Sequence, residues 1–444
     1  MQFSESSNLQ RKAERENSPA ASSLFLACGI WATRIIIGIV FIFSGWVKAV
    51  DPWGTIFKIN DYAAALHLSL PQEVMVVAAF LLCAAEFCLG VIVLSGIMRR
   101  TSAWCLLMFM AVMTPLTGWI YFASPVPDCG CFGDALVISN GATFLKNIVL
   151  TAGALFLIFR NRRVRGIILP SVQWIAVFCS MLYPMLLSLY GYAVQPLVDF
   201  RPYAVGNTLA ADDSMENPMF IYSKDGKEHS FTADNLPEGE EWNFVRREDP
   251  SHAGAQKKQL AFIDEYGDDV TTDVVGESSA PGGLLLLCVP EPEAHGISRS
   301  QMANSLNRYQ HMHNGAMAAV VAADSIGRWV KDVNAEYPVY FSDDTDLKTL
   351  ARGNASLVYV VNDTIQWKYS LYSIDPELVN SPADKRSDIL SGMTPAESSI
   401  VLPLTSGIYL MIIGTLILLS LTAIMHRSKN NLSKSVPAAG NGQS

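Results

Sequence analysis

Long apolar runs alternate with short polar loops over the first 190 residues, and one more apolar run lies near the C-terminus. Each of these runs is close to the ~20 residues that a bilayer-spanning helix needs. The pattern therefore predicts a polytopic α-helical membrane protein with six transmembrane helices. The predicted spans are residues 24–46, 74–97, 102–122, 142–160, 167–190 and 401–425.

The stretch between the fifth and sixth spans has short apolar segments instead. Met219 to Tyr222, a turn at Asp225-Gly226 and a polar return strand predict a β-hairpin. A linker of small and polar residues, Val275 to Gly283, is expected to separate this part from an α/β layer fold. The expected strands are 284–289, 318–322, 337–340, 357–361 and 365–369, the last two joined by a turn at Asn362-Asp363, and the expected helices are 298–311, 326–333 and 347–352.

Basic residues cluster beside alternate ends of the spans, and the positive-inside rule places all of these clusters in the cytoplasm. Both termini are then cytoplasmic, and the segment from about 193 to 400 lies outside the cell inner (cytoplasmic) membrane. That segment has 32 acidic and 16 basic residues, a net charge of −16 against +7 for the rest, which argues against nucleic acid as a partner. The clusters are Arg11, Lys12 and Arg15; Arg99 and Arg100; Arg160, Arg162, Arg163 and Arg165; and Arg427, Lys429 and Lys434.

These patterns divide the chain into seven parts, with membrane lipid as one partner. The first span follows a polar tail without a small-residue cleavage site, so it is expected to be an uncleaved anchor. The parts are a cytoplasmic tail (1–22), a four-helix membrane domain (23–162), a fifth transmembrane helix (163–192), a β-rich outer segment with linker (193–283), an outer α/β domain (284–400), a sixth transmembrane helix (401–426) and a second cytoplasmic tail (427–444).

The loop between the third and fourth spans contains Cys129 and Cys131 with one glycine between them. A Cys-x-Cys bridge closes a very small ring and departs from relaxed geometry, so it should be easily reduced, and Gly130 permits the unusual backbone angles. An outer location favours disulfide chemistry. We therefore predict a redox pair, with Cys129 favoured as the attacking thiol unless the following helix start activates Cys131 instead.

Two other interpretations of this loop remain open at the sequence level. The cysteines could be unreactive thiols, or half of a metal site with Asp128 and Asp134. We favour redox chemistry, in which Asp128, Gly130, Gly133 and Asp134 support the loop, and we assign no metal site. The other six cysteines are expected to pack as small apolar residues, five of them within the spans and Cys288 in a buried strand: Cys28, Cys83, Cys88, Cys105, Cys179 and Cys288.

Charged side chains inside the predicted spans are also candidates for function. Glu86 lies near the middle of the second span, where an ionised carboxylate costs several kcal/mol unless it is neutralised or paired. We expect it to face the bundle interior, as a structural partner of Arg34 or as a proton carrier beside the thiols. Arg34, within the first span, and Lys48, near its outer end, are otherwise expected to be snorkelling anchors.

The first four spans resemble the DoxX-like membrane proteins and their MauE branch, named for methylamine utilisation. The resemblance covers about residues 28 to 160. It implies a four-helix bundle that helps to form disulfides in an exported enzyme, with a membrane quinone as a possible electron acceptor. The methylamine role itself is not expected to transfer, because this chain adds two spans and an outer domain. The residues that carry the resemblance are Arg34, Gly38, Phe43, Ser44-Gly45, Lys48, Asp51-Pro52, the loop Cys129 to Asp134, and Lys146-Asn147.

The outer α/β domain resembles a thioredoxin-like domain of the peroxiredoxin type, on the basis of Tyr337-Pro338-Val339 and Leu357 to Val361. A thioredoxin active site needs Cys-x-x-Cys after the first strand, where this chain has Val289 to Glu293. The resemblance therefore implies a binding module without redox activity. The pair His311-x-His313 could form a metal fork, but such a pair near a helix end is more often solvated, so it stays unassigned.

Together these features favour a membrane thiol–disulfide oxidoreductase. Cys129 and Cys131 would exchange electrons between exported thiols and the membrane, while the acidic outer domain binds an exported protein client. The alternative is a non-catalytic scaffold whose outer domain recruits a partner. A small-molecule carrier built around Glu86 is weaker, because the spans show no clear inverted repeat.

Overall fold

A computed structural model of the chain divides it into two compact units. Unit 1 comprises residues 1–133, 137–189 and 400–444, and unit 2 comprises 134–136 and 190–399. The structure describes residues 19–126, 128–160, 166–210, 219–224, 227–231, 237, 242–248, 260–280, 282–290, 316–322, 336–353, 355–370, 373 and 396–435.

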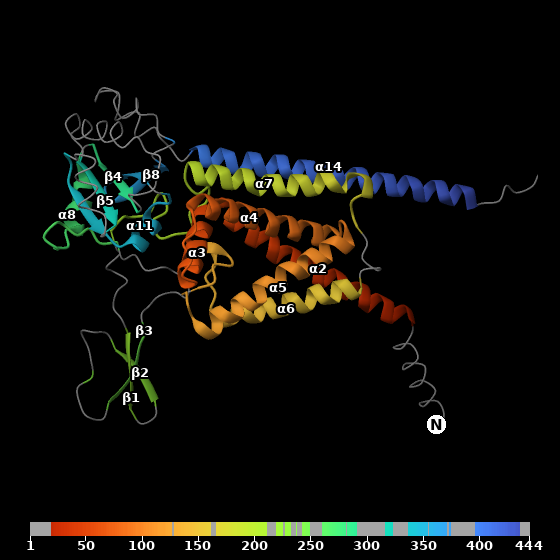
Figure 1. Cartoon of the computed structure of the whole chain (residues 1–444), viewed down its shortest axis with the longest axis horizontal. Helices are drawn as coiled ribbons and strands as arrows, with labels where there is room; N and C mark the ends of the chain where they lie inside the picture. The colour runs from red at the N-terminus through yellow and green to blue at the C-terminus, as the bar shows by residue number, and fades with distance from the viewer. Residues whose placement is uncertain are drawn as a thin grey trace, which may run out of the picture. The chain divides into compact units, whose positions relative to one another are not determined.

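Long helices make up unit 1 (Figure 1). Six of them are long and apolar enough to cross a membrane by length and composition, which confirms the number and position of the expected spans. The shorter helix α3 was not expected. The helices are α2 (Pro19–Val50), α3 (Pro52–Ala65), α4 (Gln72–Ser95), α5 (Arg99–Ala123), α6 (Asn140–Phe159), α7 (Gln173–Ala193) and α14 (Ala396–Ser435).

Glycines allow α2 and α4 to pack with their backbones in contact. A Cβ atom at Gly45 would lie 2.4 Å from the Phe87 amide nitrogen, and one at Gly90 would lie 2.6 Å from the Ile42 nitrogen. Such distances are shorter than real Cβ contacts, so these positions exclude any side chain. The same close approach at Gly38, with a Cβ 2.7 Å from Leu94 Cβ, extends the contact along both helices.

The two helices beyond the first four spans pack on each other through polar and aromatic contacts. Ser180 of α7 hydrogen-bonds to Tyr409 of α14 at 2.9 Å, and Tyr183 bonds to Ser406 at 2.8 Å. The Tyr183 and Tyr409 rings stack with centroids 4.6 Å apart. Figure 1 shows α7 and α14 running side by side. Buried hydrogen bonds between hydroxyls give this apolar helix pair a defined register.

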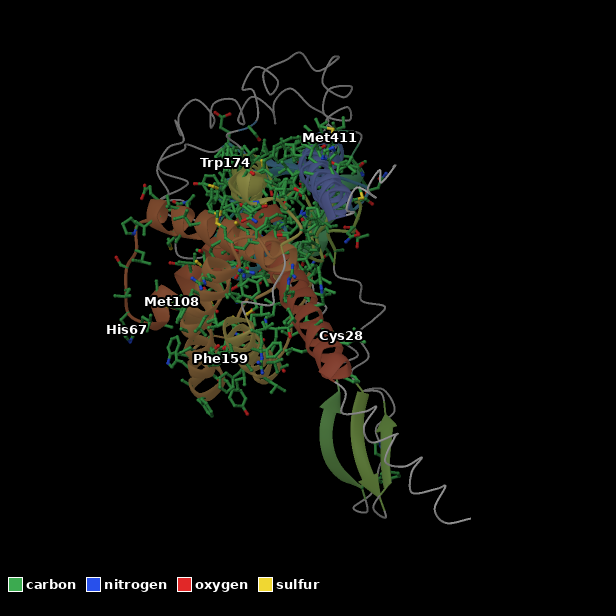
Figure 2. All side chains as sticks on the ribbon, turned by 90° about the vertical axis from the view of Figure 1, so that its right-hand side faces the viewer. Cys28, His67, Met108, Phe159, Trp174 and Met411 are labelled. Carbon is green, nitrogen blue, oxygen red and sulfur yellow. The ribbon has the colours of Figure 1, made fainter. Side chains whose placement is uncertain are left out.

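Many large apolar side chains of unit 1 point away from its interior. Met108, Phe159, Trp174 and Met411 are between 62% and 79% exposed and lie on its periphery (Figure 2). A water-soluble protein buries most of its large apolar side chains, whereas a protein in a bilayer can expose them to lipid. The exposed apolar surface is therefore consistent with lipid contact.

A five-stranded sheet forms the centre of unit 2, with strand order β6-β5-β4-β7-β8. β4, β5 and β6 are parallel, while β7 is antiparallel to β4 and β8 is antiparallel to β7. The five expected strands are thus confirmed within two residues. The strands are β4 (Leu284–Val289), β5 (Ala316–Ala322), β6 (Val339–Ser342), β7 (Ser356–Val361) and β8 (Thr364–Ser370).

The connections between these strands agree in part with those expected from the sequence. Asn362 and Asp363 both have positive φ, 47° and 62°, as a tight turn between β7 and β8 requires. The expected helix near residues 347–352 is α11 (Asp344–Leu350), which begins earlier because Asp343 caps it by accepting a hydrogen bond from the Thr345 amide at 2.8 Å. The expected helices 298–311 and 326–333, and the pair His311-x-His313, lie outside the described residues.

A separate three-stranded antiparallel sheet has the order β2-β1-β3. Strands β1 (Met219–Lys224) and β2 (Lys227–Phe231) form the expected hairpin, whose turn at Asp225-Gly226 lies outside the described residues. Strand β3 (Asn243–Glu248) pairs with β1 and was not predicted from the sequence. Its sequence has two adjacent apolar residues, Phe244 and Val245, followed by three charged ones, and so lacks the alternation that marks a strand.

The segment expected to be a linker is instead packed against the five-stranded sheet. α8 (Thr271–Gly276) and a 3₁₀ turn (Glu277–Ser279) occupy it, and Val275 and Ser278 are buried. Ser278 Oγ accepts a hydrogen bond from the Asp363 amide at 2.8 Å. The small polar residues of this segment resemble a flexible linker in sequence, because tertiary partners such as Asp363 in the β7–β8 turn come 85 residues later.

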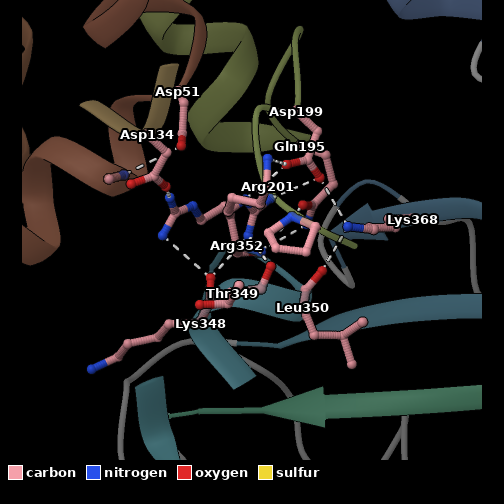
Figure 3. Close-up of polar contacts among 12 residues, drawn as sticks. Asp51, Asp134, Gln195, Asp199, Arg201, Lys348, Thr349, Leu350, Arg352 and Lys368 are labelled. Atoms are coloured by element: carbon pink, nitrogen blue, oxygen red, sulfur yellow. Dashed lines mark hydrogen bonds and ion pairs between the residues drawn. The ribbon is translucent and has the colours of Figure 1, made fainter. Parts of the chain in front are cut away.

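A chain segment that follows α7 is fastened to α11 by buried charges (Figure 3). Arg201 pairs with Asp199 at 2.8 Å and donates to the Lys348 and Thr349 carbonyls. Lys368 of β8 donates to Asp199 at 2.9 Å. Burial would raise the pKa of Asp199, but the two cations lower it below its usual range. These contacts satisfy carbonyls at the end of α11 that have no partner within the helix.

The contact between α2 and α4 gives a test of the fold. Replacing Gly45 by alanine places a methyl group against the backbone of α4, so we expect Gly45→Ala to lower the free energy of unfolding by about 1–3 kcal/mol. A methyl group at Gly414 of α14 would meet nothing within 4 Å among the described residues, and Gly414→Ala is the matched control. Denaturant unfolding of the purified protein in detergent measures both. Equal stability of the two variants would contradict the close packing of α2 on α4.

Candidate functional site

The loop between α5 and α6 brings Cys129 and Cys131 together. Their Sγ atoms are 3.1 Å apart, and both residues are partly buried. At this separation one sulfur can donate its proton to the other. The predicted pair is therefore a close pair in space, within a small movement of a covalent bridge.

Backbone geometry explains why glycine and aspartate recur in this loop. Asp128 Oδ1 accepts a hydrogen bond from the Gly130 amide at 2.8 Å, and the Gly133 amide donates to the Gly130 carbonyl at 3.1 Å. Gly130 and Gly133 have φ angles of +62° and +51°, which favour glycine. A Cβ atom on Gly130 would also lie 2.9 Å from Lys58 Cγ. Asp128, Gly130 and Gly133, three of the four residues expected to support the loop, therefore lie in the turn that the loop makes.

Helix α3 covers the loop with two polar side chains that the sequence did not identify. Lys58 Nζ lies 2.9 Å from Asp128 Oδ2, and the Tyr62 hydroxyl donates to the Cys129 carbonyl at 2.7 Å. Burial, followed by the charge of the thiols, raises the pKa of Tyr62, so this phenol stays a neutral donor. The available signal for α3 was Asp51-Pro52, because Asp51 caps the helix and proline suits its first position.

Lys48 and Glu86 form a buried ion pair near the loop. Lys48 Nζ on α2 contacts both Oε1 and Oε2 of Glu86 on α4 at 2.7 Å, and each residue is about 5–6% exposed. Ser44 Oγ lies 2.7 Å from Glu86 Oε2 and 2.6 Å from the Cys131 carbonyl oxygen. Ser44 therefore connects the ion pair to the backbone of the redox loop.

These contacts correct two expectations about the charged residues in the spans. Glu86 pairs with Lys48, not with Arg34, and Lys48 is a buried partner, not a snorkelling anchor. Arg34 precedes Lys48 by 14 residues, which is about 21 Å along a helix. Its guanidinium donates to the Val93 and Leu94 carbonyls at 3.0 and 2.7 Å, where it caps the last turn of α4.

A cavity of about 80 Å³ opens beside both thiols. One part of its wall is apolar and includes Phe41, Phe109 and Met110; the other part is polar and contains the ion pair. A single water needs only ~10–15 Å³ of such space, so the cavity can hold several waters or a small group. Its polar lining residues are Ser44, Lys48, Thr55, Lys58, Tyr62, Glu86, Cys129, Cys131, Lys146 and Asn147.

The surroundings shift the pKa values of the Cys129 and Cys131 thiols in opposite directions. The hydrogen bond from Cys129 lowers the pKa of Cys131 to about 6, and the charges of Lys146 and Lys48 act in the same direction against burial. The same hydrogen bond, together with burial, raises the pKa of Cys129 above its usual range. These shifts favour Cys131 over Cys129 as the ionised thiol, opposite to the preference drawn from the sequence.

Two further residues considered from the sequence belong to unit 2. Asp134, the fourth expected loop residue, is grouped with unit 2, where its carboxylate pairs with Arg352. Cys288 of β4 is fully buried, and burial raises its pKa to about 12, which leaves it without reactive thiolate. Among the residues that the structure describes, no group of three or more His, Cys, Asp or Glu side chains converges as a metal site would require.

Comparison with known protein families gives two matches, one of which covers the helices that hold the thiol pair. Residues 26–160 match the family described as Methylamine utilisation protein MauE, and residues 218–250 match a domain of unknown function (DUF8463). No curated protein and no solved structure matches the chain. The MauE range runs from α2 to the end of α6 and contains the thiol loop, the ion pair and the cavity. The predicted resemblance to MauE is confirmed for this range, whereas the broader DoxX-like resemblance stays a prediction; with the apolar helices, the match indicates a membrane-associated role in a redox-related system.

Proposed function

We propose that the chain is an integral membrane thiol–disulfide oxidoreductase in which Cys129 and Cys131 exchange electrons between exported thiols and the membrane. The observation that carries this proposal is the close thiol pair, 3.1 Å apart, with one lowered and one raised pKa. Such asymmetry is what disulfide exchange needs, because one sulfur must attack while the other keeps its proton until a later step.

Exchange with a client runs through a mixed disulfide. When the loop is oxidised, a client thiolate attacks one loop sulfur, and the Cys129–Cys131 bond breaks. A second client thiolate then displaces the loop, so that the client gains a disulfide and the loop gains two electrons. In the reverse direction the Cys131 thiolate attacks a client disulfide and Cys129 resolves the intermediate.

A membrane quinone is the acceptor that we propose for the electrons. The cavity suits such a group, because aromatic and methionine side chains line one part and the ammonium of Lys146 and the amide of Asn147 line another. The apolar side chains would bind a flat ring, and the Lys146 ammonium would donate to one of its carbonyl oxygens. A bound quinone would supply a two-electron acceptor next to the thiols. Lys146 would orient it, because the N–H donors of Lys48 and Asn147 already have acceptors within the protein.

We propose that unit 2 is a thioredoxin-like binding module that recruits an exported protein client. Its strand order β5-β4-β7-β8, with β4 and β5 parallel and β7 and β8 antiparallel, supports this fold. Cys288 is buried, and no Cys-x-x-Cys follows β4 in the sequence. The module would therefore bind without exchanging disulfides, and its acidic composition favours basic client surfaces.

The proposed topology places the thiol loop and unit 2 outside the inner membrane, with both termini in the cytoplasm. It rests on the four basic clusters beside the spans. An external loop would meet exported thiols in an oxidising compartment, where a disulfide can persist.

Removing one cysteine should trap the exchange intermediate. We expect Cys129→Ala to accumulate a mixed disulfide through Cys131, visible on a non-reducing gel after acid quenching as a higher-mass species that reductant removes. Cys131→Ala should accumulate less: it removes the hydrogen bond between the thiols, but burial still opposes ionisation of the remaining Cys129.

The double variant of Cys129 and Cys131 is the control and should show no such species. If neither single variant traps a partner, and the wild-type loop shows no reversible change in thiol reactivity, the chain is better explained as a non-catalytic scaffold.

The reactivity of Cys131 should depend on pH with a midpoint near 6. A lowered pKa means that the thiolate persists from alkaline pH down to about 6 and is lost below it, whereas an ordinary thiol loses its thiolate below about 8.5. The alkylation rate of reduced protein against pH measures this. Lys146→Gln removes a charge that lowers this pKa, so its midpoint should lie higher. Lys348→Gln, in unit 2, is the control and should leave the midpoint unchanged.

The topology can be tested with a membrane-impermeant maleimide on intact spheroplasts. Reduced wild-type protein should be labelled, and the double variant of Cys129 and Cys131 should lose that labelling. Labelling that appears only after the cells are broken open would reverse the orientation and remove the argument from an oxidising compartment.

A further inference from the structure

The Ser44 hydroxyl lies between two oxygen acceptors. Its Oγ atom is 2.7 Å from Glu86 Oε2 and 2.6 Å from the Cys131 carbonyl oxygen, and it accepts a hydrogen bond from Lys48 Nζ at 3.1 Å. A hydroxyl has one proton to donate. With Glu86 ionised, one of the two short oxygen–oxygen contacts therefore has no hydrogen in it.

One more proton on Glu86 completes this chain. Protonated Glu86 donates to Ser44 Oγ, and the Ser44 proton is then free for the Cys131 carbonyl. Lys48 Nζ still has Glu86 Oε1 as an acceptor at 2.7 Å. The geometry thus accommodates two protonation states of Glu86, and the protonated one anchors the loop backbone more firmly.

Glu86 is the side chain of this cavity that is best suited to accept a proton. Among the described residues that line the cavity, Glu86 is the only carboxylate, and the lysines are cations that cannot accept a proton. The titratable and charged groups that face this region are Lys48 from α2, Cys83 from α4 itself, Lys58 and Tyr62 from α3, Cys129 and Cys131 from the loop, and Lys146 from α6.

Disulfide exchange creates a need for such an acceptor. In the reduced pair, Cys129 is protonated and donates to the Cys131 thiolate. Once Cys131 is bonded to a client sulfur, it no longer accepts that proton, and Cys129 must lose it in order to attack. The cavity borders both cysteines and Glu86, and it is large enough for water to carry the proton between them.

We propose that Glu86 is the proton acceptor of this resolving step, and that Ser44 is a positioning residue that transmits the protonation of Glu86 to the Cys131 carbonyl. The inference rests on the exchange function proposed above and adds the residues that handle its proton.

The step balances in atoms and electrons. The Cys131 thiolate attacks the client disulfide, whose sulfur–sulfur bond breaks, and the first client thiolate leaves. Cys129 then transfers its proton to Glu86 and attacks the Cys131 sulfur, so that the mixed disulfide breaks and the second client thiolate leaves. The loop loses two electrons, and the client gains two. Glu86 afterwards returns the proton to solvent.

Dithiodipyridine, a small neutral disulfide whose thiopyridone product absorbs light, separates the two steps. Mixed with the reduced full-length protein in detergent, it should release one thiopyridone as Cys131 attacks and a second as Cys129 resolves. The double variant of Cys129 and Cys131 gives the background from the other cysteines. Cys129→Ala should show the first release only.

Glu86→Gln should leave the first release within about threefold of wild type and slow the second about 100-fold, at the low end of general base effects. In Glu86→Gln the Cys129 proton can leave only to solvent, so the second release should instead rise steeply with pH. Glu86→Asp should restore part of the rate, because it restores the base. Glu73→Gln, on the exposed first turn of the same helix, is the matched control and should change neither release.

A variant that restores charge balance separates proton transfer from structural damage. Glu86→Gln leaves the Lys48 ammonium buried and unpaired, whereas the double variant Lys48→Met with Glu86→Gln removes both charges. A second release that stays slow in the double variant supports the proposal. Recovery of that release would overturn it, as would an unchanged second release in Glu86→Gln. Absence of both releases in the wild type would instead refute the exchange function itself.

Discussion

The buried pair of Lys48 and Glu86 is the interaction on which the candidate site depends. Burying two charges costs several kcal/mol per ion, and only close contact with further hydrogen bonds offsets that cost. The close packing of α2 on α4 at Gly45 and Gly90 supplies this contact, because it sets both side chains at 2.7 Å. Ser44 then extends the pair to the Cys131 backbone. Helix packing, charge pairing and loop position therefore form a single arrangement.

The charges around the cavity account for the difference between the two thiols. Three lysines, Lys48, Lys58 and Lys146, line it; Glu86 pairs with Lys48, and Asp128 and Asp61 pair with Lys58. The charges of Lys146 and Lys48 lower the pKa of Cys131, whereas the hydrogen bond from Cys129 and burial raise the pKa of Cys129. Local potential thus favours one ionised sulfur and not two, which is the charge state that stepwise disulfide exchange requires.

Unit 2 also contains buried ion pairs, but there they hold parts of the fold together. Asp199 pairs with Arg201 and Lys368, and both cations also donate to carbonyls of α11. The charge of Lys368 acts on the Cys288 thiol of the sheet, but burial outweighs it and raises the pKa of that thiol to about 12. Buried ion pairs in this chain therefore fasten a fold in one unit and tune a reactive group in the other.

The sequence alone predicted the six apolar helices, the five strands of the sheet and the candidate pair Cys129 and Cys131, because these follow from local composition, periodicity and spacing. It could not choose Lys48 over Arg34 as the partner of Glu86, nor Cys131 over Cys129 as the thiolate. It also missed α3, with Lys58 and Tyr62, and took the segment packed at Ser278 for a linker. Each of these was decided by tertiary structure, because the contact, the burial and the electrostatic potential arise between residues distant in the chain.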